Sequence, residues 1–513
     1  MTLEPEFKAF EEGYRTGRSQ VVWTRLVDDL ETPVSAYLKL SQGRRYAFLF
    51  ESVQDGAWRG RFSVITLDPD LVWRARGDQA EIAEHAAIAA ETYTPQSGGA
   101  LDSLRDLIAA SRLELPPGLP PMASGVFGVI GYDMVRLAEK LPDINPDPLG
   151  LPDAIMTRPS VVAVFDSITQ EILLVTPVRP SSASARDAYD AAGARLAKVV
   201  KDLAETALPQ PGDRKAGAIR ETDFKSPISR EAYWGLVDRA KEYVAAGDIF
   251  QVVPSHRFRA PFPHTPFSLY RSLRRVNPSP YMFYLNFPDF QLVGSSPEIL
   301  VQMRDGKIII RPIAGTRPRG ETPEEDQRLE AELRADPKEH AEHLMLLDLG
   351  RNDVGRVAML GAKGKNEQAA RKSGPRVRVT DSFFVERYRF VMHLVSNVEG
   401  DAPEGVDPVD VLMAALPAGT LSGAPKVRAM EIIDELEIEK RGVAFAGAVG
   451  YFGADGSVDT CIVLRTALVK DGTVYVQAGG GVVADSDPDA EYEETVHKSR
   501  AVRRAAEEAW RFD

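Results

Sequence analysis

Residues 337–357 read PKEHAEHLMLLDLGRNDVGRV, and the rest of the chain is best understood from this stretch. Asp336, which precedes the stretch, and Pro337, its first residue, form a typical helix start, because aspartate caps free N–H groups and proline fits the first helical position. Four side chains recur at steps of three and four and so share one face of the predicted helix: Glu339, Glu342, Leu346 and Leu349. Two carboxylates therefore run into an apolar stripe, where buried charge needs a cation or a hydrogen-bond donor.

A second helix start, Asp487-Pro488, again precedes two carboxylates three residues apart, Glu491 and Glu494. Taken singly, such acids complement the dipole of a first helical turn, and Glu339 can close a capping box on Asp336. Two facing pairs would instead form an all-oxygen site of the kind that Mg²⁺ takes. Capping and a magnesium site are therefore both open at this point.

Composition is that of an ordinary globular protein. The chain has 513 residues, enough for two or more domains, with 44% hydrophobic and 27% charged residues. A formal charge of −13 argues against nucleic acid or an anionic membrane as the main partner. A single cysteine, Cys461, excludes internal disulfides, and the acidic start MTLEPEFKAFEEGY lacks a secretory signal. With no run near ~18 apolar residues, we expect a cytoplasmic protein without a membrane span.

Short apolar runs between turn signals predict antiparallel strands in local hairpins, with helices between the groups, which is an α+β fold. Asp305-Gly306 is a strong hairpin signal, and two further Asp-Gly pairs predict a meander of strands over 443–452, 458–469 and 473–477. A polar, Pro/Gly-rich segment suggests a linker. We expect an N-terminal domain (1–207), a linker (208–225) and a C-terminal domain (226–513). A basic segment, 361–378, has no assigned role.

Several short motifs suit a small polyanionic substrate. GTLSGAPK at 419–426 fails as a phosphate loop because no glycine precedes its lysine. Three consecutive glycines, Gly479, Gly480 and Gly481, follow a predicted strand and would let backbone N–H groups approach a carboxylate. Arg465 lies in a predicted apolar strand, where a guanidinium needs an anion, and His393 lies in the apolar run FVMHLVS. Each is weak alone, since such glycines are also turns and such a histidine is more often core.

Taken in order, these motifs resemble the chorismate-utilising enzymes, in particular the component I group of anthranilate synthases. The resemblance covers most of 229–504 and is looser in the first half. It rests on GDIFQVVPS, NPSPYMFYL, VGSSPEILV, RPIAGTRPRG, EHLMLLDLGRNDVGRV, VMHLVSNVEG, LPAGTLSGAPKVRAMEIIDELE, GAVGYFGADGSVDTCIVLRTALV and AGGGVVADSDPDAEYEET. It implies an antiparallel β-sheet sandwich core flanked by helices, and a lyase that needs Mg²⁺ and binds chorismate.

The resemblance also implies roles for individual residues. Glu342 and Glu494 would hold Mg²⁺, supported by Glu339 and Glu491. Glu298 would protonate the departing ring hydroxyl, His393 would assist loss of pyruvate, and Thr420 would be a polar contact in the same site. The matching substrate positions are Gly315, Thr316, Tyr451, Arg465, Gly479, Gly480 and Gly481.

Two positions separate the branches of this family. Aminodeoxychorismate synthases carry a nucleophilic lysine where this chain has Ala314, and isochorismate and salicylate synthases carry a lysine base where it has Gln251. A neutral amide cannot activate water in that way, so the pair indicates ammonia as the nucleophile at C2. Cys461 lies in an apolar strand and reads as core, so ammonia would come from a separate glutamine amidotransferase subunit, implying a hetero-oligomer.

The first half matches the family's regulatory part. Ser52, Pro280, Tyr281 and Met282 match positions that bind tryptophan as a feedback inhibitor, although the last three can equally be a proline-bounded strand start. Two other readings stay open: an aminodeoxychorismate-type synthase that has lost its lysine, and a non-catalytic tryptophan-binding regulatory subunit. Retention of all four carboxylates, Glu298 and His393 argues against the silent subunit.

Overall fold

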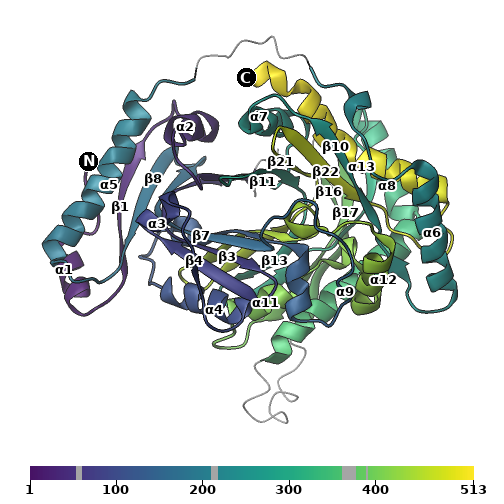
Figure 1. The fold of residues 1–513 in the computed structure, drawn as a ribbon, viewed down its shortest axis with the longest axis horizontal. Coiled ribbons are helices and arrows are strands. Elements are labelled where there is room, and N and C mark those ends of the chain that lie inside the picture. The colour runs from purple at the N-terminus through teal and green to yellow at the C-terminus, as the bar shows by residue number, and fades with distance from the viewer. Residues whose placement is uncertain (53–59, 210–217, 361–376, 389–390) are drawn as a thin grey trace.

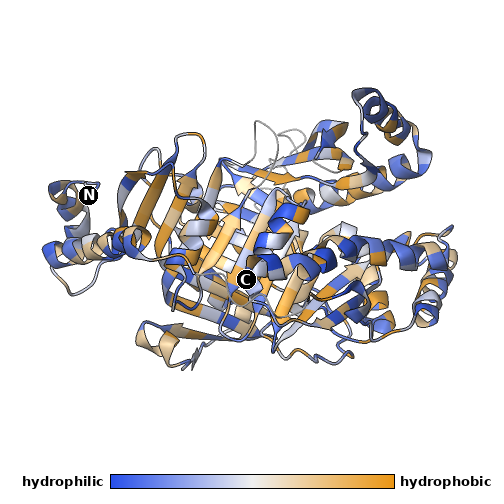
Figure 2. Ribbon diagram, turned by 90° about the horizontal axis from the view of Figure 1, so that it is seen from above, coloured by the Kyte–Doolittle hydropathy of each residue, from blue (hydrophilic) through white to orange (hydrophobic). Residues whose placement is uncertain are grey.

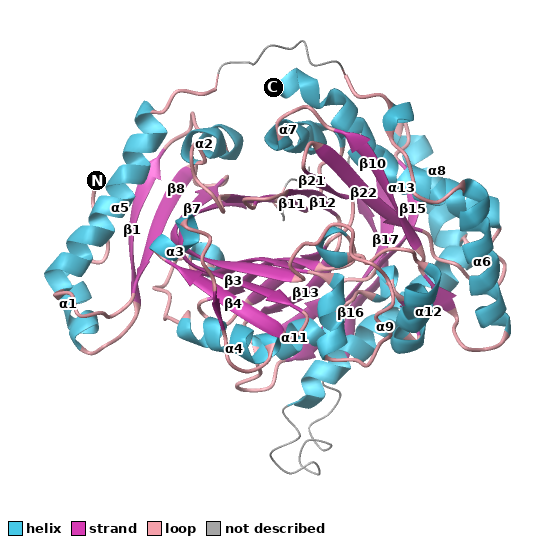
Figure 3. Cartoon of the chain, viewed as in Figure 1, coloured by secondary structure: helices cyan, strands magenta, loops and turns pink. Residues whose placement is uncertain are grey.

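The computed structural model describes residues 1–52, 60–209, 218–360, 377–388 and 391–513. Two antiparallel sheets face each other and carry helices on their outer sides (Figures 1 and 3). The basic segment 361–378 lies almost wholly outside the described residues, so its role stays unassigned.

Sheet I runs through ten strands in spatial order: β10 (Ser255–Pro261), β22 (Thr473–Gly479), β21 (Thr466–Lys470), β12 (Gln291–Ser296), β11 (Tyr281–Asn286), β2 (Phe48–Glu51), β3 (Phe62–Arg76), β7 (Ala154–Asp166), β8 (Glu171–Val178) and β1 (Gln20–Val27). The long strands β3 and β7 continue beyond sheet I. A register shift between Pro69 and Leu71 bends β3, and its second half enters the other sheet.

Sheet II starts from that second half, flanked by β4 (Gln79–Glu84) and β5 (Thr94–Pro95) on one side. On the other side of β7 follow β6 (Gly125–Ile130), β19 (Ala448–Gly453), β20 (Val458–Ile462), β13 (Ile299–Arg304), β14 (Lys307–Ile310) and β17 (Val391–Asp401). β15 (Ile313–Pro318) continues along the same edge of β17 as β14, and β16 (Val377–Arg387) covers its other edge. A separate pair joins β9 (Gln251–Val252) to β18 (Gly423–Ala424).

Helices cover both outer faces. Sheet I and its edges carry α1 (Phe7–Arg15), α2 (Pro33–Leu40), α5 (Ala185–Glu205), α7 (Pro266–Val276) and α13 (Pro488–Glu508), with α6 (Arg230–Ala245) against α13. Sheet II carries α3 (Ala86–Ala89), α4 (Ala100–Ala110), α8 (Pro323–Ala335), α9 (Pro337–Leu360) and α11 (Pro408–Ala415), and α12 (Lys426–Leu436) follows β18. The remaining elements are 3₁₀ turns: Pro121–Ala123, Tyr132–Leu137, Glu221–Asp223, Gly419–Leu421, Gly442–Ala444 and Ala509–Phe512.

The three largest apolar clusters among the described residues hold these layers together. The middle one lies between the sheets and contains Phe48, Phe127 and Phe283, while one outer cluster lies under the helices of each sheet. Side chains along β11 alternate between the middle cluster and the sheet I cluster, as the two-residue period of a strand requires. In Figure 2 the strands are predominantly apolar, and the outer helices mix apolar and hydrophilic residues. The predicted α+β sandwich flanked by helices is confirmed.

The predicted meander near the C-terminus is wrong. β19 pairs with β20 and β21 pairs with β22, but β20 belongs to sheet II and β21 to sheet I. The expected single strand over 458–469 breaks at Arg465, whose φ of 48° is in the left-handed region, so Arg465 lies at a corner and not in a strand.

The predicted division into two domains stays a prediction. Strands from both sides of the predicted linker pair with each other, β2 with β11 and β6 with β19, so both sheets draw on both halves of the chain. Among the described residues, no helix is long and apolar enough to cross a membrane.

Candidate active site

Two neighbouring chain segments each pass from one sheet to the other. Each segment carries a predicted site residue at the point where it crosses. Glu298 lies between β12 and β13, and Arg465 lies between β20 and β21. The Ile462 N–H donates to the Glu298 carbonyl oxygen at 3.1 Å, and the Ser295 N–H donates to the Arg465 carbonyl oxygen at 3.2 Å. Hydrogen bonds from the ends of β20 and β12 therefore fix the backbone at Glu298 and at Arg465.

The Glu298 carboxyl is buried, and burial raises its pKa to about 8. The Thr420 hydroxyl donates to it, 3.4 Å from both oxygens, and the Arg465 guanidinium adds a weaker opposing effect on that pKa. A carboxyl that keeps its proton at neutral pH can donate it to a leaving group.

The Arg465 guanidinium has no carboxylate partner within ion-pair distance among the described residues. Burial lowers its pKa, while Tyr388 and Glu298 act in the opposite direction. A half-buried guanidinium without a protein counter-ion is a natural receptor for a carboxylate ligand.

His393 lies on β17 with its ring buried, and burial lowers its pKa to about 4, with the Arg465 charge acting in the same direction. Its Nδ1 lies 3.2 Å from the Gly315 carbonyl oxygen and 2.9 Å from Thr316 Oγ1. Because a carbonyl only accepts, Nδ1 carries the hydrogen and Nε2 keeps its lone pair. The imidazole is therefore a neutral potential base, held by the β15 strand.

Gly479, which ends β22, and the following Gly480 and Gly481 are tightly surrounded. A Cβ at Gly480 would lie 3.0 Å from Glu491 Oε2, and one at Gly481 would lie 2.4 Å from Gln251 Nε2. Gln251 is buried, and its Oε1 has no hydrogen-bond partner in the described structure. The glycines thus leave room for two polar side chains that a larger residue would displace.

The four predicted metal carboxylates come from α9 and α13. Burial raises the pKa of Glu342, with contributions from the charges of Glu339 and Glu494, and burial also raises that of Glu491. Glu491 Oε1 accepts from the Ser486 hydroxyl at 2.7 Å, whereas its buried Oε2 has no hydrogen-bond partner in the part of the chain that the structure describes. Oxygen donors that repel one another, one of them buried and unpartnered, fit a divalent cation chemically. Across the described residues, however, no three His, Cys, Asp or Glu side chains already lie close enough to hold an ion.

Protein cations meet these carboxylates in the present arrangement. Lys498 Nζ lies 2.6 Å from Glu494 Oε1 and donates to the Gly479 carbonyl oxygen at 3.3 Å. Arg317 Nη1 lies 2.9 Å from Glu339 Oε1. The Glu339 side chain is thus paired across to β15, although its backbone N–H does donate to the capping Asp336 carboxylate at 3.3 Å.

Comparisons with known proteins place the chain in a family. A family model described as chorismate binding enzyme matches residues 68–504. The chain belongs to the chorismate-binding enzyme family. It is 54% identical over 99% of its length to the anthranilate synthase component 1 of Cereibacter sphaeroides, covering 98% of that protein. Identity to the protein of the same name from Pseudomonas aeruginosa is 47%, over 93% of each chain.

Two solved structures have the same fold. The crystal structure of anthranilate synthase component I from Streptococcus pneumoniae matches with a TM-score of 0.73 and 34% identity, covering 93% of this chain and 99% of that one. The menaquinone-specific isochorismate synthase of Escherichia coli matches with a TM-score of 0.69 at 18% identity, covering 97% and 99%, which concerns the fold alone.

In this chorismate-binding enzyme, direct contacts and charge effects link most predicted catalytic, substrate and metal positions into one group. A Cβ at Gly315 would lie 3.1 Å from Glu339 Oε2, which joins the His393 side of the site to the carboxylates. Tyr451 lies apart from this group. Its ring packs 5.4 Å from that of Phe127 between the sheets, so its assignment as a substrate contact stays a prediction.

The predicted inhibitor positions meet where β2 ends beside the start of β11. Glu51 pairs with Met282 in the β2–β11 register, which places Ser52 beside Tyr281, preceded by Pro280. The Tyr281 hydroxyl donates to Asp459 Oδ1 at 3.2 Å. The Met282 side chain packs on the opposite, helix-covered face of sheet I, so only its backbone faces the Tyr281 side.

Sequence reasoning missed Lys498. It lies four residues after Glu494 on the same face of α13, and this spacing was the available signal.

Proposed function

We propose that this protein is the chorismate-aminating component of an anthranilate synthase, converting chorismate and ammonia to anthranilate, pyruvate and water. The observation that carries the proposal is the protonated Glu298 beside Arg465, which has no carboxylate partner among the described residues. One supplies a proton and the other a receptor for a substrate carboxylate. The names of the relatives support the same reaction.

In the first step ammonia attacks C2 of the ring, the ring double bonds shift, and the C4–O bond breaks. Glu298 gives its proton to the departing hydroxyl, which leaves as water, and the new ammonium group loses a proton. Thr420 holds the Glu298 carboxyl in place through its hydroxyl. Ala314 offers no nucleophile and Gln251 no base for water, which favours ammonia over the alternatives.

In the second step the ring aromatises and the enolpyruvyl group leaves as pyruvate. The hydrogen on C2 must be removed and a proton must reach the methylene carbon of the leaving group. The Nε2 lone pair of His393 suits the first of these transfers, since the imidazole is neutral above its pKa of about 4. Gly315 and Thr316 hold the His393 imidazole in the required tautomer.

We propose Mg²⁺ as the cofactor, held by Glu342 and Glu494 with Glu339 and Glu491 in support. When bound it would neutralise and orient the ring carboxylate. Lys498 neutralises part of the carboxylates' charge when no metal is present. Residues 479–481 let the substrate approach the backbone closely.

Partners and control complete the proposal. A component 1 needs a second component, and we propose a glutamine amidotransferase that supplies ammonia, because buried Cys461 has a strongly raised pKa and cannot act as a thiolate. Tryptophan would inhibit by binding near Ser52 and Tyr281. We expect the protein to act in the cytoplasm.

The test is the reaction of purified protein with chorismate, Mg²⁺ and ammonium, followed by anthranilate fluorescence and by released pyruvate. Equal amounts of both products, lost on chelation, are expected. An aminated product without pyruvate would instead indicate an aminodeoxychorismate-type enzyme. Chorismate left untouched while tryptophan binds would identify a silent regulatory subunit.

A further inference from the structure

Arg441 is one of the largest fully buried side chains of the protein, and it forms an ion pair with Glu437, which is also buried. Arg441 Nη2 lies 2.5 Å from Glu437 Oε1, and Nε lies 3.0 Å from Oε2, so the contact is bidentate. Removing two charges from water is costly, and the pair must be compensated by further hydrogen bonds.

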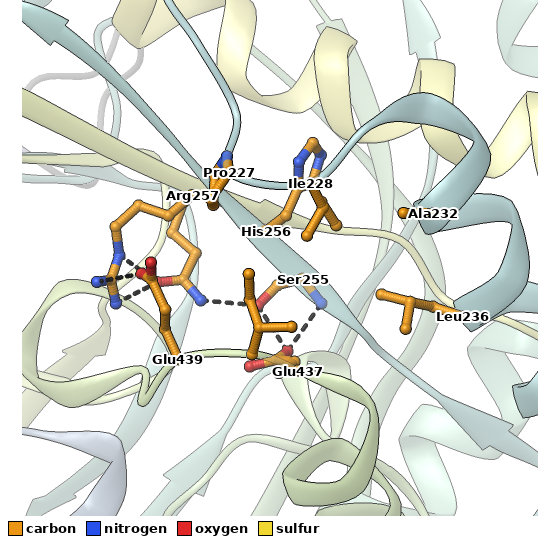
Figure 4. Close-up of a pocket in the computed structure, with 11 residues that line it drawn as sticks. Pro227, Ile228, Ala232, Leu236, Ser255, His256, Arg257, Glu437 and Glu439 are labelled. Carbon is orange, nitrogen blue, oxygen red and sulfur yellow. Dashed lines mark hydrogen bonds and ion pairs between the residues drawn. The ribbon is translucent and has the colours of Figure 1, made fainter. Parts of the chain in front are cut away.

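Those further bonds go to backbone groups and one hydroxyl near the proposed active site. Arg441 Nη1 donates to the Leu421 carbonyl oxygen at 2.6 Å, and Nη2 donates to the Val253 carbonyl oxygen at 2.7 Å. Glu437 Oε1 accepts from the backbone N–H and the hydroxyl of Ser255, at 2.8 and 2.7 Å. Figure 4 shows Glu437 below Ser255, joined to it by both bonds.

Each of these segments carries a residue of the proposed site. Leu421 follows Thr420, the donor to Glu298. Val253 lies two residues after Gln251, and Ser255 is the register partner of Gly479. One ion pair, which touches no proposed substrate contact through its own side chains, therefore ties the segment after Thr420 to the segment 251–255, and Ser255 in turn pairs with Gly479.

We propose that Glu437 and Arg441 are positioning residues, which hold Thr420 against Glu298 and hold the Gln251 segment against the glycines after β22. This inference rests on the proposed function, since it names how the same site is kept in shape. A guanidinium can donate in two directions at once from a fixed plane, whereas a lysine ammonium offers a single point charge.

A neighbouring cavity leaves one side of these contacts unfilled. A space of about 100 Å³ lies beside Ser255 and Glu437, with Ile228, Ala232 and Leu236 among its other lining residues. Because the wall is not packed tightly on that side, the Ser255 segment has room to shift once the ion pair is weakened.

The test is Arg441→Lys in the full-length protein, assayed with chorismate, Mg²⁺ and ammonium across pH. Thr420 lowers the pKa of Glu298, so losing that contact should move the alkaline limb of kcat/KM to higher pH. We expect Arg441→Lys to move the limb in the same direction as Thr420→Val, with kcat/KM roughly tenfold to a hundredfold lower. The double variant should show no further shift.

Arg158→Lys is the matched control, because Arg158 is also buried in an ion pair, with Asp70, but lies on β7 away from these segments. Arg158→Lys should lower the free energy of unfolding and leave the alkaline limb of kcat/KM at the wild-type pH. An unshifted limb in Arg441→Lys, or shifts that add in the double variant, would overturn the inference. If Arg441→Lys does not fold, Glu437→Asp takes its place.

A second readout does not need turnover. The Glu298 carboxyl can be titrated by carbon NMR in the full chain labelled at glutamate, with Glu298→Gln assigning the signal. An upward shift of its pKa in Arg441→Lys supports the positioning role even if wild-type protein makes no anthranilate, which would refute only the proposed function. An unchanged titration refutes the positioning role.

Discussion

The carboxyl of Glu298 and the guanidinium of Arg465 lie at the same corner of the sandwich and do not form an ion pair with each other. An ion pair would lower the pKa of the carboxyl and remove its proton at neutral pH. Instead burial prevails, and the pKa of Glu298 is raised to about 8. The corner thus keeps an acid and a free cation close together, a combination that suits a substrate bringing its own carboxylates.

The first prediction follows from that pKa. Glu298 is protonated below about pH 8 in the free protein, so kcat/KM should fall as pH rises through about 8 and the acid loses its proton. Glu298→Gln should remove this limb and lower kcat by roughly 10²–10⁴-fold, the usual contribution of a general acid. Stopped assays of anthranilate across pH measure both effects. A full-rate Glu298→Gln enzyme would exclude Glu298 as the acid.

His393 should affect the second step selectively. Its pKa of about 4 means that the ring is neutral above that value, so its protonation should cause no loss of activity between pH 5 and 8. His393→Ala should still consume chorismate but release pyruvate slowly, since the aminated intermediate lacks its base. Chromatography of quenched reactions would show that intermediate. Equal loss of both steps would contradict this role.

Local sequence signals predicted the elements near the site well. Asp336 and Asp487 cap α9 and α13 as expected, and Asp305-Gly306 and Asp471-Gly472 form the turns of the β13–β14 and β21–β22 hairpins. These signals work because caps and two-residue turns depend on a few adjacent residues.

The crossing between the sheets was not predictable in the same way. Arg465 sits in a run of residues that reads as one strand, and only the pairing of β20 with β13 and of β21 with β12 divides it. Such pairings join residues more than a hundred positions apart, and no local pattern encodes them. The position of Tyr451 between the sheets depends on another long-range pairing, that of β19 with β6.

Glu342 should be needed for metal binding. Glu342→Gln removes one anionic oxygen from the proposed magnesium set, and it should abolish turnover while leaving the circular dichroism spectrum unchanged. Calorimetric titration with Mg²⁺ in the absence of ammonium measures binding directly. Glu493→Gln is the control, because Glu493 lies beside Glu494 on α13 but pairs with Arg230 at the surface. Wild-type activity in Glu342→Gln would exclude the proposed role of Glu342 in binding the metal.

Ser52 should matter for inhibition and not for catalysis. Ser52→Phe places a large ring beside Tyr281, where tryptophan is proposed to bind, so the tryptophan concentration for half inhibition should rise roughly tenfold or more. Activity without tryptophan should stay within about twofold of wild type, because Ser52 is no part of the proposed active site. Inhibition curves at fixed chorismate provide the measurement. An unchanged curve would place the inhibitor elsewhere.

Gly481→Ala should separate function from stability. The new Cβ would lie 2.4 Å from Gln251 Nε2, the far end of a side chain that can move, so the free energy of unfolding should change by less than about 1 kcal/mol. The displaced amide should nevertheless lower kcat/KM by roughly tenfold, as small misplacements in active sites do. Gly235→Ala on α6 is the control, since its Cβ meets no atom within 4 Å, and it should keep full activity. Melting curves and kinetics of both variants provide the measurement. Normal activity in Gly481→Ala would show that the position of Gln251 is unimportant to the reaction. A large loss of stability would show that the glycine is required for packing.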